Sequence, residues 1–139
     1  MILIVAEHAD GKLTPITYEL AAMARPVAQE LERTLAVVVL SNTVDSVQDE
    51  LQGLDLDQII LIRDPKLERY TSDGYVAALG ALIAAKEPFL VISGHTSVGY
   101  DFIPRLAAGI CSTYPLGRVR LVLDERCRPH LPSRSLDEP

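Results

Sequence analysis

One stretch of the sequence decides the fold: residues 89–108 are FLVISGHTSVGYDFIPRLAA. Phe89 to Ser93 form a short run of nearly continuous hydrophobicity, which is typical of a strand covered on both faces of a parallel sheet. A turn with two glycines follows. A helix is expected to begin around Asp101, with Pro104 tolerated in its first turn because the donors there have no intrahelical partner. The stretch therefore predicts a strand, a tight turn and a helix.

The rest of the chain repeats this alternation. Three more short apolar runs, rich in valine and isoleucine, precede the stretch: Ile2 to Ala6, Leu35 to Leu40, and Gln58 to Ile62. Segments with helical spacing of apolar residues lie between the runs: Pro15 to Glu32, Val44 to Gln52, and Ser72 to the residue before Pro88. Alternating strands and helices predict an α/β fold, a doubly wound and mainly parallel sheet flanked by helices.

The C-terminal part has a different pattern. Arg118 to Leu123 alternate polar and apolar residues, as a half-exposed strand does. Glu125 and Arg126 can turn the chain back near Cys127, which predicts a short antiparallel extension. Residues 129–139 have no periodicity and are expected to form a loose tail.

Composition limits the partners of the protein. The chain has 139 residues, about one domain, with 48% hydrophobic and 23% charged residues. Thirteen Lys and Arg against 19 Asp and Glu give a net charge of -6, which opposes binding to nucleic acid or anionic lipid. The first apolar run meets Glu7 too soon for a signal peptide, and no run approaches the roughly 18 apolar residues of a spanning helix. We expect a cytoplasmic protein without membrane insertion.

A candidate site follows from the sheet. Parallel sheets bind ligands beyond the carboxyl ends of their strands, where the winding order reverses. If the first and fourth strands are neighbours there, the loop of residues 7–11 faces the loop of residues 94–101. The second loop supplies glycines for close approach, hydroxyl donors and a helix N-terminus. Its candidate anion-binding or nucleotide-binding residues are Gly94, Thr96, Ser97, Gly99 and Asp101.

The same loop is equally typical of an ordinary strand-to-helix turn with Ser97 or Asp101 as a helix cap. His8 and His95 can meet across the crevice, but the spacing brings no nucleophile to a base, and the sequence has no GxSxG elbow. The glycine-rich Rossmann and P-loop fingerprints are also absent. The sequence therefore predicts a chain that is not an enzyme by itself. Arg105 is expected to form a surface pair with Asp101, four residues before it.

The motifs on either side of this crevice resemble a known family. Residues 2–8, ILIVAEH, look like the start of electron-transferring flavoprotein α subunits. Residues 94–108 are similar to that family's Gly-Ala-Thr-Ser-x-Gly-Arg-Asp-Leu-x-Pro-Arg-Leu-Ala-Ala. The similarity runs in register from Met1 to about Asp124. Two departures are His95 in place of a small residue and Tyr100 in place of the usual arginine.

The resemblance implies that residues 1–128 form an N-terminal domain of the electron transfer flavoprotein α/β-subunit type, in the adenine nucleotide alpha hydrolase-like (HUP-like) class. In the family, a second α-subunit domain holds most of the FAD, and the related region of the β subunit binds AMP. The sequence stops short of that second domain, so FAD or AMP is expected only in a complex with a partner subunit.

Three functions fit these observations. The first is a scaffold or accessory subunit in flavin-dependent electron transfer, with a β-subunit-like or FAD-domain protein as its partner. The alternative is a stand-alone sensor that binds AMP or ATP in the crevice. The third is a homodimer that associates through the surface a partner would otherwise cover.

Overall fold

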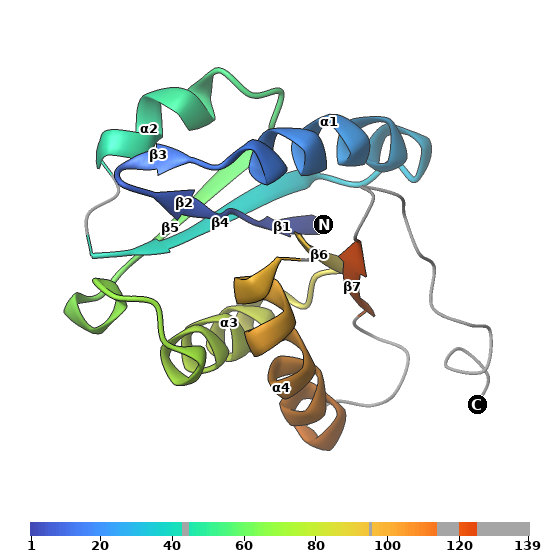
Figure 1. Cartoon of the computed structure of the whole chain (residues 1–139). Helices are drawn as coiled ribbons and strands as arrows, with labels where there is room; N and C mark the ends of the chain where they lie inside the picture. Colours follow the sequence, from blue (N-terminus) through green and yellow to red (C-terminus); the bar gives the residue numbers. More distant parts are fainter. Residues whose placement is uncertain (43–44, 95, 114–119, 125–139) are drawn as a thin grey trace.

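The computed structural model describes residues 1–42, 45–94, 96–113 and 120–124. Its centre is a five-stranded parallel sheet with the strand order β5-β4-β1-β6-β7 (Figure 1). The strands are β1 (Ile2–Val5), β4 (Leu35–Ser41), β5 (Gln58–Arg63), β6 (Leu90–Gly94) and β7 (Arg120–Asp124). The predicted α/β class with a doubly wound, mainly parallel sheet is confirmed.

Helices cover both faces of the sheet, α1 and α2 on one side and α3 and α4 on the other (Figure 1). Their bounds are α1 (Pro15–Glu30), α2 (Asp45–Gln52), α3 (Ser72–Lys86) and α4 (Ser97–Thr113), with a short 3-10 helix, η1 (Pro65–Leu67), before α3. None of these helices, in the ranges given above, is long and apolar enough to cross a membrane.

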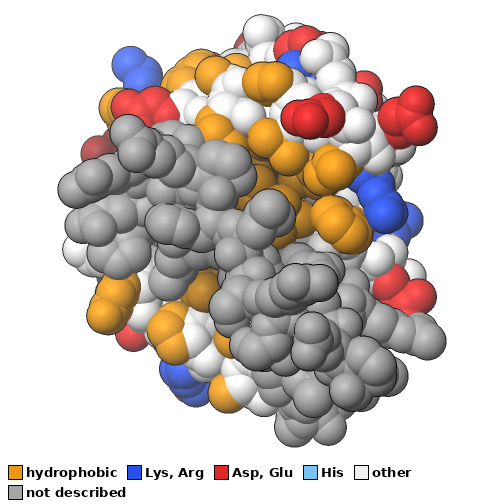
Figure 2. Space-filling view, turned by 90° about the vertical axis from the view of Figure 1, so that its right-hand side faces the viewer, with side chains coloured by type: hydrophobic (Ala, Val, Ile, Leu, Met, Phe, Trp, Pro, Cys, Tyr) orange, Lys and Arg blue, Asp and Glu red, His pale blue; other side chains and the backbone are white. Residues whose placement is uncertain are grey.

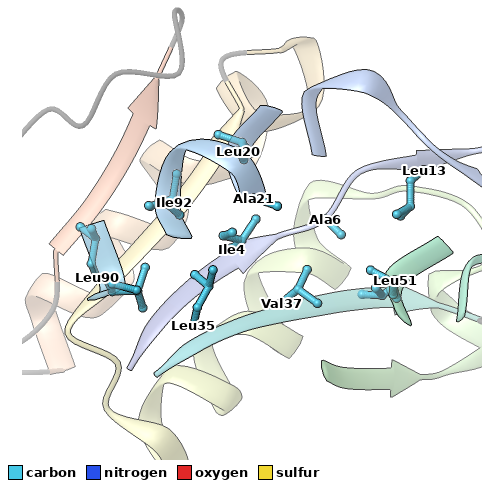
Figure 3. Close-up of a cluster of buried hydrophobic side chains, with 14 of the residues drawn as sticks. Ile4, Ala6, Leu13, Leu20, Ala21, Leu35, Val37, Leu51, Leu90 and Ile92 are labelled. Carbon is cyan, nitrogen blue, oxygen red and sulfur yellow. The ribbon is translucent and has the colours of Figure 1, made fainter. Parts of the chain in front are cut away.

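The two layers explain why β1 is apolar at every position. Ile2 and Ile4 pack into the core beneath α1 and α2, whereas Leu3 and Val5 pack into the core beneath α3 and α4. Figure 3 shows the first of these cores, in which Ile4 lies among side chains from β4, β6 and α1. A strand buried on both sides has no position for a polar residue, which is the physical origin of the continuous apolar runs.

A small antiparallel hairpin follows β1 and is made by β2 (His8–Ala9) and β3 (Lys12–Leu13). Its turn residues Asp10 and Gly11 have φ values of 53° and 76°. Positive φ at both central residues is the geometry of a tight hairpin turn, and glycine and aspartate tolerate it best. The hairpin brings residues of the first predicted loop to the carboxyl edge of the sheet.

One predicted boundary was wrong. Helix α4 begins at Ser97 and not around Asp101, so Pro104 lies in the helix interior and not in its first turn. The reason is a cap: the amide of Gly99 donates to the Thr96 hydroxyl oxygen at 3.1 Å, which starts the helix directly after β6. Helix α1 ends at Glu30, close to its predicted end at about Glu32, whose left-handed φ of 53° stops the helix.

At the C-terminal side, β7 runs parallel to β6, from the pair Leu90 and Arg120 to the pair Gly94 and Asp124. The antiparallel extension near Cys127 was predicted for residues 125–128, which lie outside the described residues, as does the predicted tail 129–139. The antiparallel strands that the structure does describe are β2 and β3, near the N-terminus.

Candidate functional site

The winding order of the sheet reverses between β1 and β6, which are parallel neighbours. The loops after both strands therefore leave the same carboxyl edge side by side, as the sequence predicted. A direct contact joins them, because the hydroxyl of Thr96 donates to the Glu7 carboxylate at 2.5 Å. The two loops that the sequence predicted to face each other are thus in contact at this edge.

Several hydrogen bonds hold Glu7 at this edge. Its backbone N–H donates to the hydroxyl oxygen of Thr17 at 2.9 Å, and its carbonyl accepts from the same hydroxyl at 2.9 Å. The amide and hydroxyl of Thr14 also donate to that carbonyl. The first turn of α1 therefore holds the end of β1 in place. Burial raises the pKa of the Glu7 carboxyl above its ordinary value, and the hydrogen bond from Thr96 partly opposes this shift.

The five predicted site residues occupy different environments along the second loop. Gly94 ends β6, and a Cβ there would lie 2.6 Å from Cγ1 of Ile16, so its small size permits close packing against α1. Gly99 is buried in the first turn of α4, and Ser97 is exposed at the start of that helix. Thr96 caps α4 and bonds Glu7.

Asp101, the last of the five, accepts a hydrogen bond from the Tyr70 hydroxyl at 2.6 Å. The predicted surface pair of Asp101 with Arg105 was therefore wrong. The guanidinium of Arg105 instead contacts Asp73 and Ser72 at the start of α3, so its bonds link α3 to α4. The side chains of Thr96 and Asp101 are thus both engaged within the protein.

The structure describes His8, one of the two histidines expected to meet across the crevice. Nε2 of His8 lies 2.8 Å from the carbonyl oxygen of Leu40, which requires Nε2 to carry a proton and donate it. His95 lies outside the described residues. In the described ranges, no group of His, Cys, Asp and Glu side chains is placed to hold a metal ion.

A cavity of about 410 Å³ opens at this edge, beyond β1. The residues that line it are Glu7, His8, Ala9, Asp10, Thr14, Leu67, Glu68, Tyr70, Tyr75 and Val98. Sequence reasoning found its β1 side but missed the wall made by η1 and the start of α3. Those residues follow β5, at the far edge of the sheet, and nothing local in the sequence indicates that they return to β1.

The aromatic part of this wall is packed in a chain of ring contacts. The rings of Tyr70 and Tyr75 lie 4.8 Å apart between centroids at 77°, and those of Tyr75 and Phe102 lie 5.2 Å apart at 61°. Burial, followed by the nearby charge of Glu7, raises the pKa of Tyr75 to about 12. Burial and the Asp101 carboxylate raise the pKa of Tyr70 as well.

A parallel sheet of this order, with its winding reversal between β1 and β6 and helices on both faces, defines the class of doubly wound α/β domains. Comparison with known families then identifies the particular group. The family described as "Electron transfer flavoprotein domain" matches residues 2–111, and the chain therefore belongs to this family. The resemblance seen in the sequence is confirmed.

Curated relatives agree with this assignment. The chain is 35% identical over 107 residues to the electron transfer flavoprotein subunit alpha of Bacillus subtilis, covering 77% of this chain and 32% of the relative. It is 32% identical over 107 residues to the acryloyl-CoA reductase electron transfer subunit beta of Anaerotignum propionicum, covering 77% of this chain and 29% of the relative. The chain thus spans about a third of the length of these relatives.

Proposed function

We propose that this chain acts as a scaffold or accessory subunit in flavin-dependent electron transfer and carries out no reaction by itself. The observation that carries the proposal is the family match over residues 2–111. Relatives named as electron transfer subunits support it. Because the chain spans about a third of those relatives, the flavin would be held by polypeptide outside this sequence.

The partner we propose is a β-subunit-like protein or one that carries the FAD-binding domain, and a second copy of this chain is the alternative. Apolar side chains gather on the face seen from the side of β7, which supports a protein contact there (Figure 2). A further apolar group, Tyr100 on α4, is 62% exposed. A cytoplasmic location for this complex stays a prediction of the sequence.

In this proposal, FAD or AMP binds to the complex of this chain with its partner. The loop that carries Gly94, Thr96, Ser97, Gly99 and Asp101 is the proposed contact for a phosphate group, because it leads into the N-terminus of α4, where the helix dipole favours an anion. Since Thr96, Asp101 and the Gly99 amide hold internal hydrogen bonds, the contact would come from the Ser97 hydroxyl and the backbone amides of Ser97 and Val98.

The test is reconstitution. The chain is co-expressed with a protein that carries the family's flavin domain, and the mixture is separated by size-exclusion chromatography with flavin absorbance recorded. The proposal expects one complex that contains both chains and flavin, and a colourless peak for the chain alone. A chain that stays separate from β-like and FAD-domain proteins alike, with no flavin in any fraction, would contradict it.

Calorimetry with AMP and ATP separates this proposal from the stand-alone sensor. The sensor predicts saturable binding by the isolated chain, weakened by Ser97→Ala. The scaffold proposal predicts no binding by the isolated chain at millimolar nucleotide. Sedimentation of the chain alone tests the homodimer hypothesis. This hypothesis predicts that the measured mass doubles as the protein concentration rises.

A further inference from the structure

Strand β5 is an open edge of the sheet. Among the residues that the structure describes, its one neighbour strand is β4, and β7 lies at the opposite edge. Every residue of β4 is buried, whereas the four apolar residues of β5 are only half-buried. Both faces of β5 already pack against helices, because Ile59 and Leu61 join one core and Ile60 and Ile62 join the other. The remaining exposure therefore comes from the missing neighbour strand.

The hydrogen-bond pattern shows which backbone groups point to this open edge. The amide of Ala6 donates to the Val38 carbonyl at 3.0 Å, so even-numbered residues of β4 face β1 and odd-numbered ones face β5. The amide of Asp64 donates to the Ser41 carbonyl at 3.3 Å, so even-numbered residues of β5 face β4. The backbone groups of the odd-numbered residues 59–63 therefore point away from the sheet. Such groups are a template for another strand.

Strand β5 carries none of the usual devices that keep an edge from pairing within its own span. Edges are commonly blunted by proline, by a bulge, or by charged side chains along the strand. The sequence of β5 is QIILIR, with a continuous apolar run between Gln58 and Arg63 and no proline or glycine. Its register against β4 is unbroken from Gln58 to Arg63, so the strand has no bulge. The edge is thus able to accept a partner strand.

The charges at the two ends of β5 match an antiparallel copy of the same strand. Asp57 precedes β5 and Arg63 ends it, with side chains that are 45% and 54% exposed. Opposite residues of an antiparallel pair share a face, so a two-fold axis through the sheet requires one residue to lie opposite itself. With Ile60 at this centre, Asp57 of each copy lies opposite Arg63 of the other. A centre at Leu61 would place Arg63 opposite Ile59, and a centre at Ile59 would place Asp57 opposite Leu61.

Both charges also lie on the same face of the sheet, as a cross-strand pair requires. Arg25 of α1 contacts Asp57 at 3.2 Å, and Asp45 of α2 contacts Arg63 at 2.7 Å. Helices α1 and α2 cover one face of the sheet. In the two-fold arrangement, each of these pairs gains an opposite charge from the second copy. Charge complementarity therefore selects the register centred on Ile60.

We propose that β5 pairs antiparallel with β5 of a second copy, centred on Ile60, so that the two sheets become continuous. Ile59 of each copy exchanges backbone hydrogen bonds with Leu61 of the other, and the two Ile60 side chains pack together. A single strand pair buries less surface than a standard interface, so the dimer forms at high protein concentration. It leaves the β7 side free for the proposed partner subunit, and the inference does not depend on the scaffold role.

Hydrogen exchange followed by NMR tests this interface residue by residue on the full chain, at about 20 μM and at about 1 mM. The amides of Ile59 and Leu61 should exchange about tenfold more slowly at the higher concentration, because only the dimer gives them partners. The amides of Ile60 and Ile62 face β4 and should be protected equally at both concentrations. The same exchange rates for Ile59 and Leu61 at the two concentrations would overturn the proposal.

Sedimentation of variants assigns the association to the charges at this edge. Arg63→Glu brings two carboxylates together at each end of the interface and should weaken the dimer by about tenfold. Arg69→Glu makes the same change of net charge at an exposed residue outside β5 and should leave the association unchanged. Asp45→Asn removes the intrachain partner of Arg63 but keeps the arginine, and it should not weaken the dimer either.

Circular dichroism shows whether each variant is folded, and the exchange measurement on the wild-type chain stands even if Arg63→Glu unfolds. A wild-type chain that stays monomeric at about 1 mM would overturn the proposal, as would equal effects of Arg63→Glu and Arg69→Glu. A dimer that Arg63→Glu leaves intact would also overturn it, because the copies would then associate through another surface. Reconstitution with a flavin-domain protein tests the scaffold role separately, since β5 lies at the edge opposite β7.

Discussion

Thr96 and Glu7 lie 89 positions apart in the sequence, yet the hydroxyl of Thr96 donates directly to the Glu7 carboxylate. The same hydroxyl oxygen accepts from the amide of Gly99 and caps α4. One side chain therefore joins the end of β1 to the start of the helix after β6. This contact holds the two loops of the candidate site together.

Replacement of Thr96 should show how much this contact stabilises the folded protein. Thr96→Val removes both the cap and the bond to Glu7, and we expect a loss of about 1–2 kcal/mol in the free energy of unfolding. Urea denaturation followed by circular dichroism measures it. Thr96→Ser keeps the hydroxyl and should lose much less. Equal losses for the two variants would mean that the hydroxyl contributes nothing.

Close packing at Gly94 predicts that a larger side chain at this position destabilises the protein. A Cβ at this position meets Cγ1 of Ile16 at 2.6 Å, so Gly94→Ala should cost about 1–3 kcal/mol of stability. The cost should shrink in an Ile16→Ala background, because the clashing atom is gone. Gly80→Ala is the matched control: outside its own turn of helix, no atom of the described residues lies within 4 Å of a Cβ added there, and alanine in α3 should stabilise by about 0.5–1 kcal/mol.

The raised pKa of Glu7 predicts a dependence on pH. Its folded pKa lies above the ordinary value of 4.5, so folding favours the protonated carboxyl. Its contribution to stability is complete below about pH 4.5 and is lost as pH rises through the folded pKa. Glu7→Gln stays neutral, so the stability of wild type relative to this variant should fall across that window. Unfolding curves at a series of pH values measure the difference, and a difference that rises with pH would contradict the buried-carboxyl explanation.

The bridge from Arg105 to α3 predicts a small and specific coupling. A double-mutant cycle of Arg105→Gln with Asp73→Asn should give a coupling energy of about 0.2–1 kcal/mol, the usual size for an exposed pair. The parallel cycle with Asp101→Asn should give almost none, because Asp101 bonds Tyr70. A larger coupling in the second cycle would favour the pair expected from helical spacing.

Much of the fold could be read from local pattern. The run Leu35 to Leu40 predicts a buried strand because both of its faces must be covered, and the structure covers both. The start of α1 follows from Pro15, which suits a first helical position. The start of α4 was placed too late because its cap is Thr96, a residue whose hydroxyl is oriented by Glu7 across the sheet edge.

The sequence alone determined the layered α/β architecture, the family and the two loops at the winding reversal, because these depend on periodicity and on contiguous motifs. The tertiary structure alone decided that Tyr70 and Tyr75 close a cavity against Glu7, and that Asp101 is bonded to Tyr70. Local pattern encodes which face of an element is buried. It does not encode which distant segment covers that face, since this depends on how the crossover after β5 packs over the sheet.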